Sequence, residues 1–436
     1  MSSPKSNAGQ QNSASLRVSF FYNLHLIIQK RFLTIIHSDC FTKFISAKCV
    51  KQIGILGKEI KTPFGGTQRK YILGLSLGPS STVLLHELNE NVEYQLDKGR
   101  PAPFELTVVY VDPSSSSPST SEDAKAAADA LERCRARYPR FSFKRVPLSA
   151  ALGLRTIDWS ALPLTLDGNE ERTADERLND LFASLPSVTS RADILRLLTR
   201  HLLINEARQN SCHAVLLGHS TTALAELTLA ETAKGRGFSL PWQINDGSLN
   251  VVDFDGEEVE EASSSPVAPG TQTVEQPTNN NTEKTPTSPE TIRIYHPLRD
   301  LLRRELITYT TLTVPPLTDL LPPASASELA TAAVVSHRDL SIEEVMVRYF
   351  AEVEKEYPSV VANVARTTGK LIRLFGDSQQ QHQETTCGVC SMPLDEQGDE
   401  RWRGELGDQD YNHEGERVGE GKQARLCYGC ERSIRG

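Results

Sequence analysis

The stretch "YILGLSLGPSSTVLLHEL", Tyr71–Leu88, decides the fold. An apolar run is followed by a short loop of Gly, Pro and Ser, and then by an apolar pattern of helical period. This order is typical of a strand, a loop and a helix whose first N–H groups can hold a phosphate. The loop Ser76–Ser81 is too short for a Walker loop and lacks its lysine. The stretch therefore predicts a different kind of phosphate loop, or a ligand-free turn.

The rest of the chain repeats the alternation of strand and helix, which predicts an α/β fold with a doubly wound, mostly parallel sheet. Further strands are expected at Phe104–Asp112, Phe141–Leu148, His213–Ser220 and from Ile292, and helices at Ser80–Leu88, Ala124–Arg137, Ser190–Asn210, Ala223–Gly235 and Ser341–Phe375, the last broken at Pro358.

Shifts in composition divide the chain into five segments. Residues 1–39 form a poorly determined N-terminal segment, and 40–254 form the first part of the α/β domain. Residues 255–290 are acidic and rich in Ser, Thr, Pro and Asn, which predicts a disordered insert. Residues 291–376 complete the domain with C-terminal helices. Residues 377–436 form a small module with two CxxC pairs around an acidic loop.

The net charge of −9 is unevenly distributed. Asp255–Glu290 holds eight acids and one lysine, and Asp395–Gly421 holds ten acids and three arginines, so the remainder carries about +5. The folded part is thus mildly basic, which is compatible with a nucleic-acid partner. The apolar stretch near residues 16–36 is interrupted by polar and charged residues and is too short for a membrane span. We expect a cytoplasmic protein with no membrane contact.

The loop resembles the pyrophosphatase-type motif SGGxDS, which grips ATP during adenylation. Ser76, Gly78 and Ser81 match the motif, whereas Leu77 replaces a glycine and Ser80 replaces the acid. Pro79 removes an N–H donor, and one lost charge-assisted hydrogen bond costs about 1.5–3 kcal/mol. We expect Leu77 to place its side chain where a phosphate would approach. ATP binding is therefore not expected, and the alternative is a strand-to-helix turn without a ligand.

The second half of the fold carries the partner motif of these enzymes, G-H-x-x-D-D-x-A-E, in degenerate form. In "LLGHSTTALAE" Gly218, His219 and Glu226 match, but the paired acids fall on Thr222 and Ala223. Loss of acids from both motifs predicts a retained scaffold with no catalytic residue. The alternative for His219 is that it simply ends a strand.

Four of the eight cysteines form CxxC pairs, which points to a metal site in a reducing compartment. Four thiolates suit a structural Zn²⁺, an iron–sulfur cluster is a second possibility, and two disulfides are a third. The expected ligands are Cys387, Cys390, Cys427 and Cys430.

Several arginines could contact the phosphates of a nucleic acid on one basic surface, and the alternative is a solvated helix face. Arg236 lies between two glycines, either on an exposed turn or at a helix end. The candidates are Arg196, Arg200, Arg236, Arg299 and Arg303, with Arg293 and Arg304 nearby.

Four stretches together give a resemblance to a known family: "LGLSLGPSSTVLLHEL", "ADILRLLTRHLLINEA", "LLGHSTTALAELTLAETAKGRGFSLP" and "YHPLRDLLRRELITY". They resemble the cytoplasmic tRNA 2-thiolation protein 2 family, whose loop usually has Ser where its active paralogue has Asp. The N-terminal cysteine pairs of the family are not matched, since "SDCF" keeps only Cys40.

The resemblance implies the non-catalytic subunit of the enzyme that 2-thiolates the wobble uridine U34 in cytosolic tRNAs for Lys, Glu and Gln. It implies a heterodimer with cytoplasmic tRNA 2-thiolation protein 1, and sulfur from a thiocarboxylated ubiquitin-related modifier. Two other functions remain open. One is a stand-alone ATP-dependent tRNA thiolase, and the other is a zinc-dependent protein-interaction module.

Overall fold

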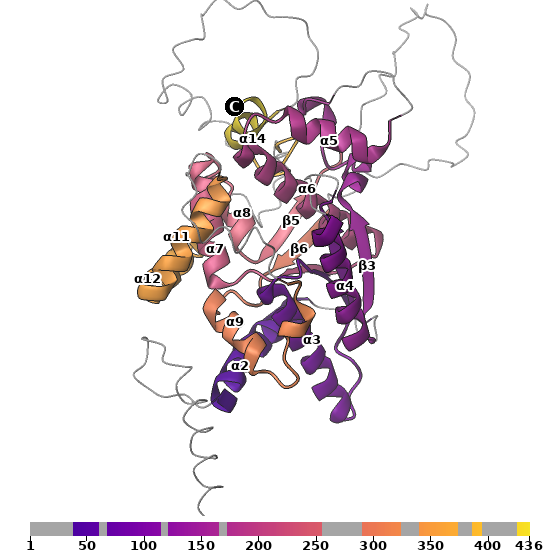
Figure 1. Ribbon diagram of the computed structural model, residues 1–436, viewed down its shortest axis with the longest axis vertical. Helices are drawn as coiled ribbons and strands as arrows, with labels where there is room; N and C mark the ends of the chain where they lie inside the picture. The colour runs from indigo at the N-terminus through magenta and orange to yellow at the C-terminus, as the bar shows by residue number, and fades with distance from the viewer. Residues whose placement is uncertain are drawn as a thin grey trace, which may run out of the picture.

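The computed structural model describes residues 38–60, 68–114, 121–164, 172–254, 290–323, 340–373, 386–394 and 425–436. Six strands form one sheet in the order β3-β2-β1-β4-β6-β5 (Figure 1). All neighbours pair in parallel except β5 and β6, which are antiparallel. The prediction of a mostly parallel α/β sheet is confirmed.

The strands are β1 (Arg69–Gly74), β2 (Phe104–Asp112), β3 (Ser142–Pro147), β4 (Ala214–Leu217), β5 (Gly247–Val251) and β6 (Glu290–Tyr295). The longer helices are α2 (Ser38–Glu59), α3 (Pro79–Asp97), α4 (Ser121–Arg137), α5 (Ala174–Ser184), α6 (Val188–Gln209), α7 (Thr221–Ala233), α9 (Arg303–Leu312), α11 (Ile342–Glu356) and α12 (Pro358–Thr368). Two short helices, α8 (Leu240–Ile244) and α14 (Tyr428–Arg435), complete the described set.

Two apolar cores cover the two faces of the sheet. Alternation along β1 divides its side chains, so that Tyr71 and Leu73 face one core and Ile72 faces the other. The first core contains α2, α3, α4 and α9. The second contains α5, α6 and the cysteine segments with α14, which therefore pack against the α/β domain instead of forming a detached module. In Figure 1, α14 lies beside α6.

A third, smaller cluster joins α7 to α11 and α12 through Ala225, Phe350 and Val361. The predicted break at Pro358 is confirmed, because α11 ends at Glu356 and α12 begins at the proline. Proline is well tolerated in a first turn, where its missing N–H is not needed.

Several boundaries differ from the sequence prediction. The predicted strands after Tyr71 and His213 end earlier, at Gly74 and Leu217. Helix α2 and the edge strand β5 were not predicted. Helix α3 begins at Pro79, one residue before the predicted start at Ser80, with Gly78 as its N-cap and without a side-chain cap. Of the predicted insert 255–290, residues 255–289 lie outside the described residues, whereas Glu290 begins strand β6. The acidic loop lies outside the described residues at 395–424.

Candidate functional site

The two degenerate motifs lie side by side at the carboxyl ends of β1 and β4. These strands are neighbours, and the chain proceeds outward from them in opposite directions, to β2 and β3 on one side and to β6 on the other. Such a switch point is where open α/β sheets usually bind ligands. A Cβ on Gly218 would lie 2.8 Å from the Cα of Ser81, so only glycine permits this approach of the two loops.

The position of Leu77 differs from the prediction. Its side chain is only 2% exposed and packs in the core that contains α3, and Leu77 does not line the pocket. The left-handed backbone at Leu77, with φ of 60°, turns the side chain inward. The expectation that Leu77 blocks the approach of a phosphate is therefore wrong.

The remaining loop residues keep the turn together and line the pocket. The hydroxyls of Ser76 and Ser81 lie 3.1 Å apart, and that of Ser81 donates to the carbonyl of Gly78 at 3.1 Å. Ser80 and Pro79 also line the pocket. The loop thus presents hydroxyl groups and the start of a helix, but no acid.

The residues at the second motif have structural partners. The hydroxyl of Thr222 donates to Glu354 at 2.7 Å and accepts from the N–H of Arg303 at 3.0 Å. Glu226 is held by both terminal nitrogens of Arg303, each at 2.5 Å. Glu226, the glutamate retained from the motif, therefore holds the guanidinium of Arg303 in place and joins α7 to α9. Burial raises the pKa of Glu226, against the opposing effect of Arg303.

His219 lines the pocket next to His296, with ring centroids 5.1 Å apart. Its Nδ1 is buried and has no hydrogen-bond partner among the described residues. Burial, together with His296 and nearby arginines, lowers the pKa of His219 to about 3. The imidazole is consequently neutral at physiological pH.

The loops, the sheet and α6 enclose a pocket of about 600 Å³, a size that suits a small molecule. Its walls are mainly apolar, with Val109, Val111, Val215, Leu217 and Ile294 from the three strands β2, β4 and β6. The described lining includes three arginines but neither aspartate nor glutamate; the arginines are Arg196, Arg200 and Arg303.

Three predicted tRNA contacts form ion pairs within the chain. Arg196 pairs with Glu231 at 2.8 Å, Arg299 with Asp246 at 2.7 Å, and Arg303 with Glu226. These three side chains remain 22–28% exposed. Arg200 instead donates from Nη2 to the carbonyl of Trp242 at 3.2 Å, and its buried Nε has no described partner.

The prediction that Arg236 lies on an exposed turn and contacts tRNA is contradicted. Its side chain is fully buried and donates to both carboxylate oxygens of Asp193, at 2.9 and 2.5 Å. Burial in this ion pair leaves no part of the guanidinium accessible to a phosphate. Nη2 of Arg236 also lies 3.4 Å from the Sγ of Cys430.

The four cysteines of the CxxC pairs meet at one point, with all their Sγ atoms within 4.8 Å of one another. The Sγ atoms of Cys390 and Cys427 are 3.8 Å apart. The N–H of Cys427 donates to the Sγ of Cys387 at 3.3 Å, and the N–H of Cys430 to the Sγ of Cys427 at 3.4 Å. Donors of this kind stabilise thiolates, so the four residues fit a metal ion.

A buried charge network connects these cysteines to the α/β domain, and sequence reasoning missed it. Asp193 accepts from Arg236, from Lys234 at 2.7 Å and from the hydroxyl of Ser433 at 2.7 Å. Although burial alone would raise it, Arg236 and Lys234 hold the pKa of Asp193 well below its usual range. Asp193 and Glu231 belong to a cluster of carboxylates that are close enough together to hold a metal ion. In this structure both carboxylates form ion pairs with the side chains of Lys234 and Arg236.

His201 forms a second connection to the cysteine segments. Its Nδ1 lies 2.9 Å from the hydroxyl of Thr156, and its Nε2 lies 3.0 Å from the carbonyl of Val389. Burial lowers the pKa of His201 to about 4. Polar residues such as Asp193 and His201 within the apolar helix 188–209 were the available signal, but the sequence does not identify their partners.

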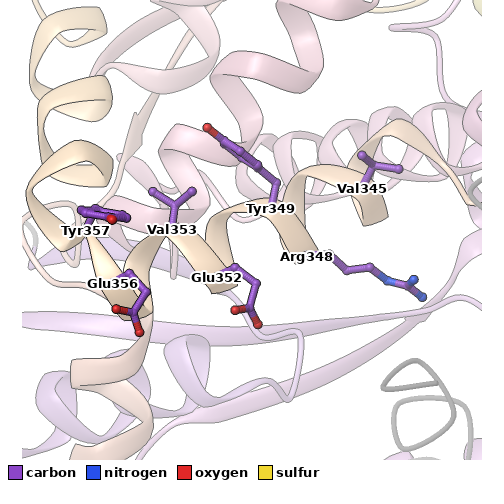
Figure 2. Close-up of a pocket in the computed structure, with 7 residues that line it drawn as sticks. All are labelled: Val345, Arg348, Tyr349, Glu352, Val353, Glu356 and Tyr357. Carbon is purple, nitrogen blue, oxygen red and sulfur yellow. The ribbon is translucent and has the colours of Figure 1, made fainter. Parts of the chain in front are cut away.

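A second hollow, of about 570 Å³, lies along α11. Figure 2 shows Val345, Tyr349 and Val353 projecting to one side of the helix, and Glu352 and Glu356 to the other. Its described lining comes from α11 and the adjoining Tyr357, and it contains both acidic and basic groups. It contains no cluster of chemically reactive side chains comparable to the pocket at β1 and β4.

No helix among the described residues is both long enough and apolar enough to cross a bilayer. A solved U34-tRNA thiolase, NcsA from Methanococcus maripaludis with its 4Fe-4S cluster, is 16% identical. The comparison covers 84% of this chain and 88% of that one, with a TM-score of 0.47.

Comparison with protein families gives a direct assignment. The family model "Cytoplasmic tRNA 2-thiolation protein 2" matches residues 341–432. A protein of that name from Phaeosphaeria nodorum is 34% identical over 401 residues, which is 91% of this chain and 89% of the relative. Another from Aspergillus fumigatus is 30% identical over 408 residues, 92% and 94% of the two chains. The chain therefore belongs to the cytoplasmic tRNA 2-thiolation protein 2 family.

Proposed function

We propose that this chain is the non-catalytic subunit of a cytoplasmic enzyme that thiolates tRNA. The proposed reaction replaces the 2-oxygen of wobble uridine U34 by sulfur in tRNAs for Lys, Glu and Gln. The active subunit would be cytoplasmic tRNA 2-thiolation protein 1, and a thiocarboxylated ubiquitin-related modifier would supply the sulfur. Family membership supports the role in tRNA thiolation.

One observation carries the non-catalytic assignment: the described lining of the pocket contains no carboxylate. Adenylation with ATP requires Mg²⁺ to offset the charge on the phosphates, and Mg²⁺ is held by carboxylates. Thr222 and Ala223 stand where the paired acids would be, and Thr222 is engaged by Glu354. The pocket therefore lacks the groups that would bind the metal form of ATP.

We further propose that tRNA contact involves Arg299, together with Arg196, Arg200 and Arg303 at the pocket. Arg299 and Arg303 are held in fixed directions by Asp246 and Glu226 and remain partly exposed. Such preorganised guanidinium groups lose little side-chain entropy when they bind a phosphate. Arg236 is excluded from this set by its burial.

We propose that the four cysteines hold one structural Zn²⁺. With Zn–S bonds of about 2.3 Å and tetrahedral angles, two ligand sulfurs lie about 3.8 Å apart. The Cys390–Cys427 separation of 3.8 Å has this value. A cubane iron–sulfur cluster places inorganic sulfide and iron between its thiolates and needs a wider site. Zn²⁺ supplies no redox chemistry here, and Arg236 and the backbone N–H groups would stabilise the thiolates.

The test is to delete the gene and measure 2-thiouridine in bulk tRNA by mass spectrometry. We expect 2-thiouridine to be lost, and to be restored by the wild-type chain. Purification of the restored chain should recover a paralogue with an intact SGGxDS loop. Unchanged thiolation would reject the role. Thiolation of tRNA by the purified chain alone with ATP would reject the non-catalytic assignment.

A further inference from the structure

The outer face of α11 is largely exposed in the part of the chain that the structure describes. The opposite face of the helix packs on α7 through Phe350, which is buried. On the outer face, Tyr349 is 52% exposed, and Tyr357 at the end of the helix is 65% exposed. The residues that line the hollow of about 570 Å³ recur at intervals of three and four, so they share this one face. Exposed apolar surface of this kind is typical of interaction sites.

This outer face has an apolar side and a charged side. Figure 2 shows the apolar side, with Val345, Tyr349 and Val353. The charged side is formed by Arg348, Glu352 and Glu356. The two glutamates are four residues apart on one helix, where like charges repel each other. Neither Arg348 nor Glu352 forms an ion pair with another side chain among the described residues.

We propose that a second copy of this chain covers the outer face of α11, with the two α11 helices antiparallel about a two-fold axis. This assembly goes beyond the proposed function and does not depend on it. A two-fold axis brings a surface against itself, so the surface must complement itself. In an antiparallel pair the apolar sides meet each other, and so do the charged sides. In a parallel pair the apolar side of each helix would meet the charged side of the other.

The apolar residues are spaced so that they pair throughout such an interface. When Tyr349 is level with Val353 of the second copy, Val345 is level with Tyr357 of that copy. The two-fold axis repeats both pairs. Each aromatic ring therefore packs against a valine, and no two rings compete for the same space. Aromatic side chains covered in this way often contribute much of the binding energy of an interface.

The same register pairs the charges. Arg348 then lies between Glu352 and Glu356 of the second copy, about 3 Å along the axis from the level of each, because a helix rises about 1.5 Å per residue. One guanidinium can bind two carboxylates, and it relieves the repulsion between them. The two-fold axis provides this arrangement twice. The face is therefore complementary to itself in charge as well as in shape.

The proposed interface is small, so the dimer should be weak. Helix α11 has 15 residues and is about 22 Å long. One face of such a helix buries less than the roughly 800 Å² per partner of a standard interface. We expect reversible dimerisation with a Kd on the order of 1–100 μM.

The experiment is sedimentation equilibrium of the purified full-length chain at concentrations up to about 200 μM, where a monomer–dimer equilibrium should appear. Arg348→Glu places three acids on the charged side of both copies and should weaken the dimer by at least about tenfold, because like charges then face each other. Arg177→Glu is the matched control, since Arg177 is exposed on the distant helix α5, and the Kd should be unchanged.

A charge swap separates loss of the interface from loss of the fold. The double variant Glu352→Arg with Glu356→Arg should also dimerise weakly by itself, for the same reason as Arg348→Glu. When these two variants are mixed, three acids face three arginines, and a mixed dimer at least as tight as the wild type should form. Thermal unfolding should remain cooperative in each variant.

Three results would overturn the proposal. The first is a wild-type chain that stays monomeric up to about 200 μM. The second is a dimer that Arg348→Glu leaves as tight as before, and the third is a failure of the mixed variants to associate. If the wild type were monomeric and Arg348→Glu removed a paralogue from the purified chain, a different protein would occupy this face, which also overturns the proposal. None of these measurements reports thiolation, so they are distinguishable from a failure of the proposed function.

Discussion

The pocket and the cysteine site lie on the same helix, α6, but differ in how completely their polar groups are paired. Toward the pocket, Arg200 and His219 have buried nitrogens without described partners. Toward the cysteines, Asp193 accepts from four different side chains and His201 has contacts at both ring nitrogens, although Nε of Arg236 also lacks a described partner. Saturated buried groups stabilise a structure, whereas unpaired ones are costly unless a ligand pairs with them. The difference indicates that the cysteine side is structural and that the pocket is a place for binding.

The largest expected effect is the loss of a cysteine ligand. Cys390→Ser should reduce bound zinc from about one ion per chain to near none and destabilise this region by more than about 5 kcal/mol, because metal binding is coupled to folding. Zinc content and thermal unfolding measure the two effects. Cys40→Ser is the control, since Cys40 is exposed and far from the site. Full zinc content in Cys390→Ser would contradict the assignment of ligands.

Breaking the charge network should have the next largest effect. Arg236→Gln leaves Asp193 without its main partner in a buried site, which costs about 3–5 kcal/mol. It should also speed the release of zinc to a chelator, because Arg236 contacts Cys430. Denaturant unfolding and chelator kinetics are the measurements. Arg432→Gln, at an exposed position of α14, should change neither, and equal effects of the two variants would contradict a special role for Arg236.

The way the free energy of unfolding changes with pH should reveal the contribution of His201. Its pKa is about 4 in the folded chain against an ordinary value of 6.5, so the unfolded chain binds more protons between these values. The free energy of unfolding should therefore fall as the pH drops from 6.5 toward 4, by about 2 kcal/mol from this residue between pH 7 and pH 5. Over the same pH interval, the free energy of unfolding of the His201→Gln variant should fall by about 2 kcal/mol less than that of the wild type. Parallel curves for the two proteins would show that His201 does not contribute.

The smallest effect is expected in the loop. Ser76→Ala removes one hydroxyl contact with Ser81 at an exposed position, and it should lower the free energy of unfolding by less than about 1 kcal/mol. Denaturant unfolding of the Ser76→Ala and Arg236→Gln variants compares the two losses in the free energy of unfolding. If the loop variant were as destabilising as the network variant, the contrast between a binding region and a structural region would fail.

The two regions also differ in how much of them could be predicted. The paired CxxC spacing predicted which four cysteines would come together, as they do in the structure, because two cysteines from each turn can approach one point from both sides. Loss of the motif acids was likewise visible in the sequence. The direction of Leu77 was not, because it depends on a left-handed backbone at a non-glycine residue. For Arg236 the flanking glycines left an exposed turn and a helix end as alternatives, and the structure has the helix end, directly after α7 with Gly235 in a left-handed conformation.

The sequence by itself determined the alternation of strands and helices, the degenerate motifs and the family, since these depend on local period and residue identity. Tertiary structure alone decided which charges are paired. Asp193, Arg236 and Ser433 are far apart in the chain and meet only when α14 packs against α6. Burial makes these ion pairs necessary, whereas Arg200 has no ion pair within the part of the chain that the structure describes, because the cost of an unpaired charge depends on its surroundings and not on its neighbours in sequence.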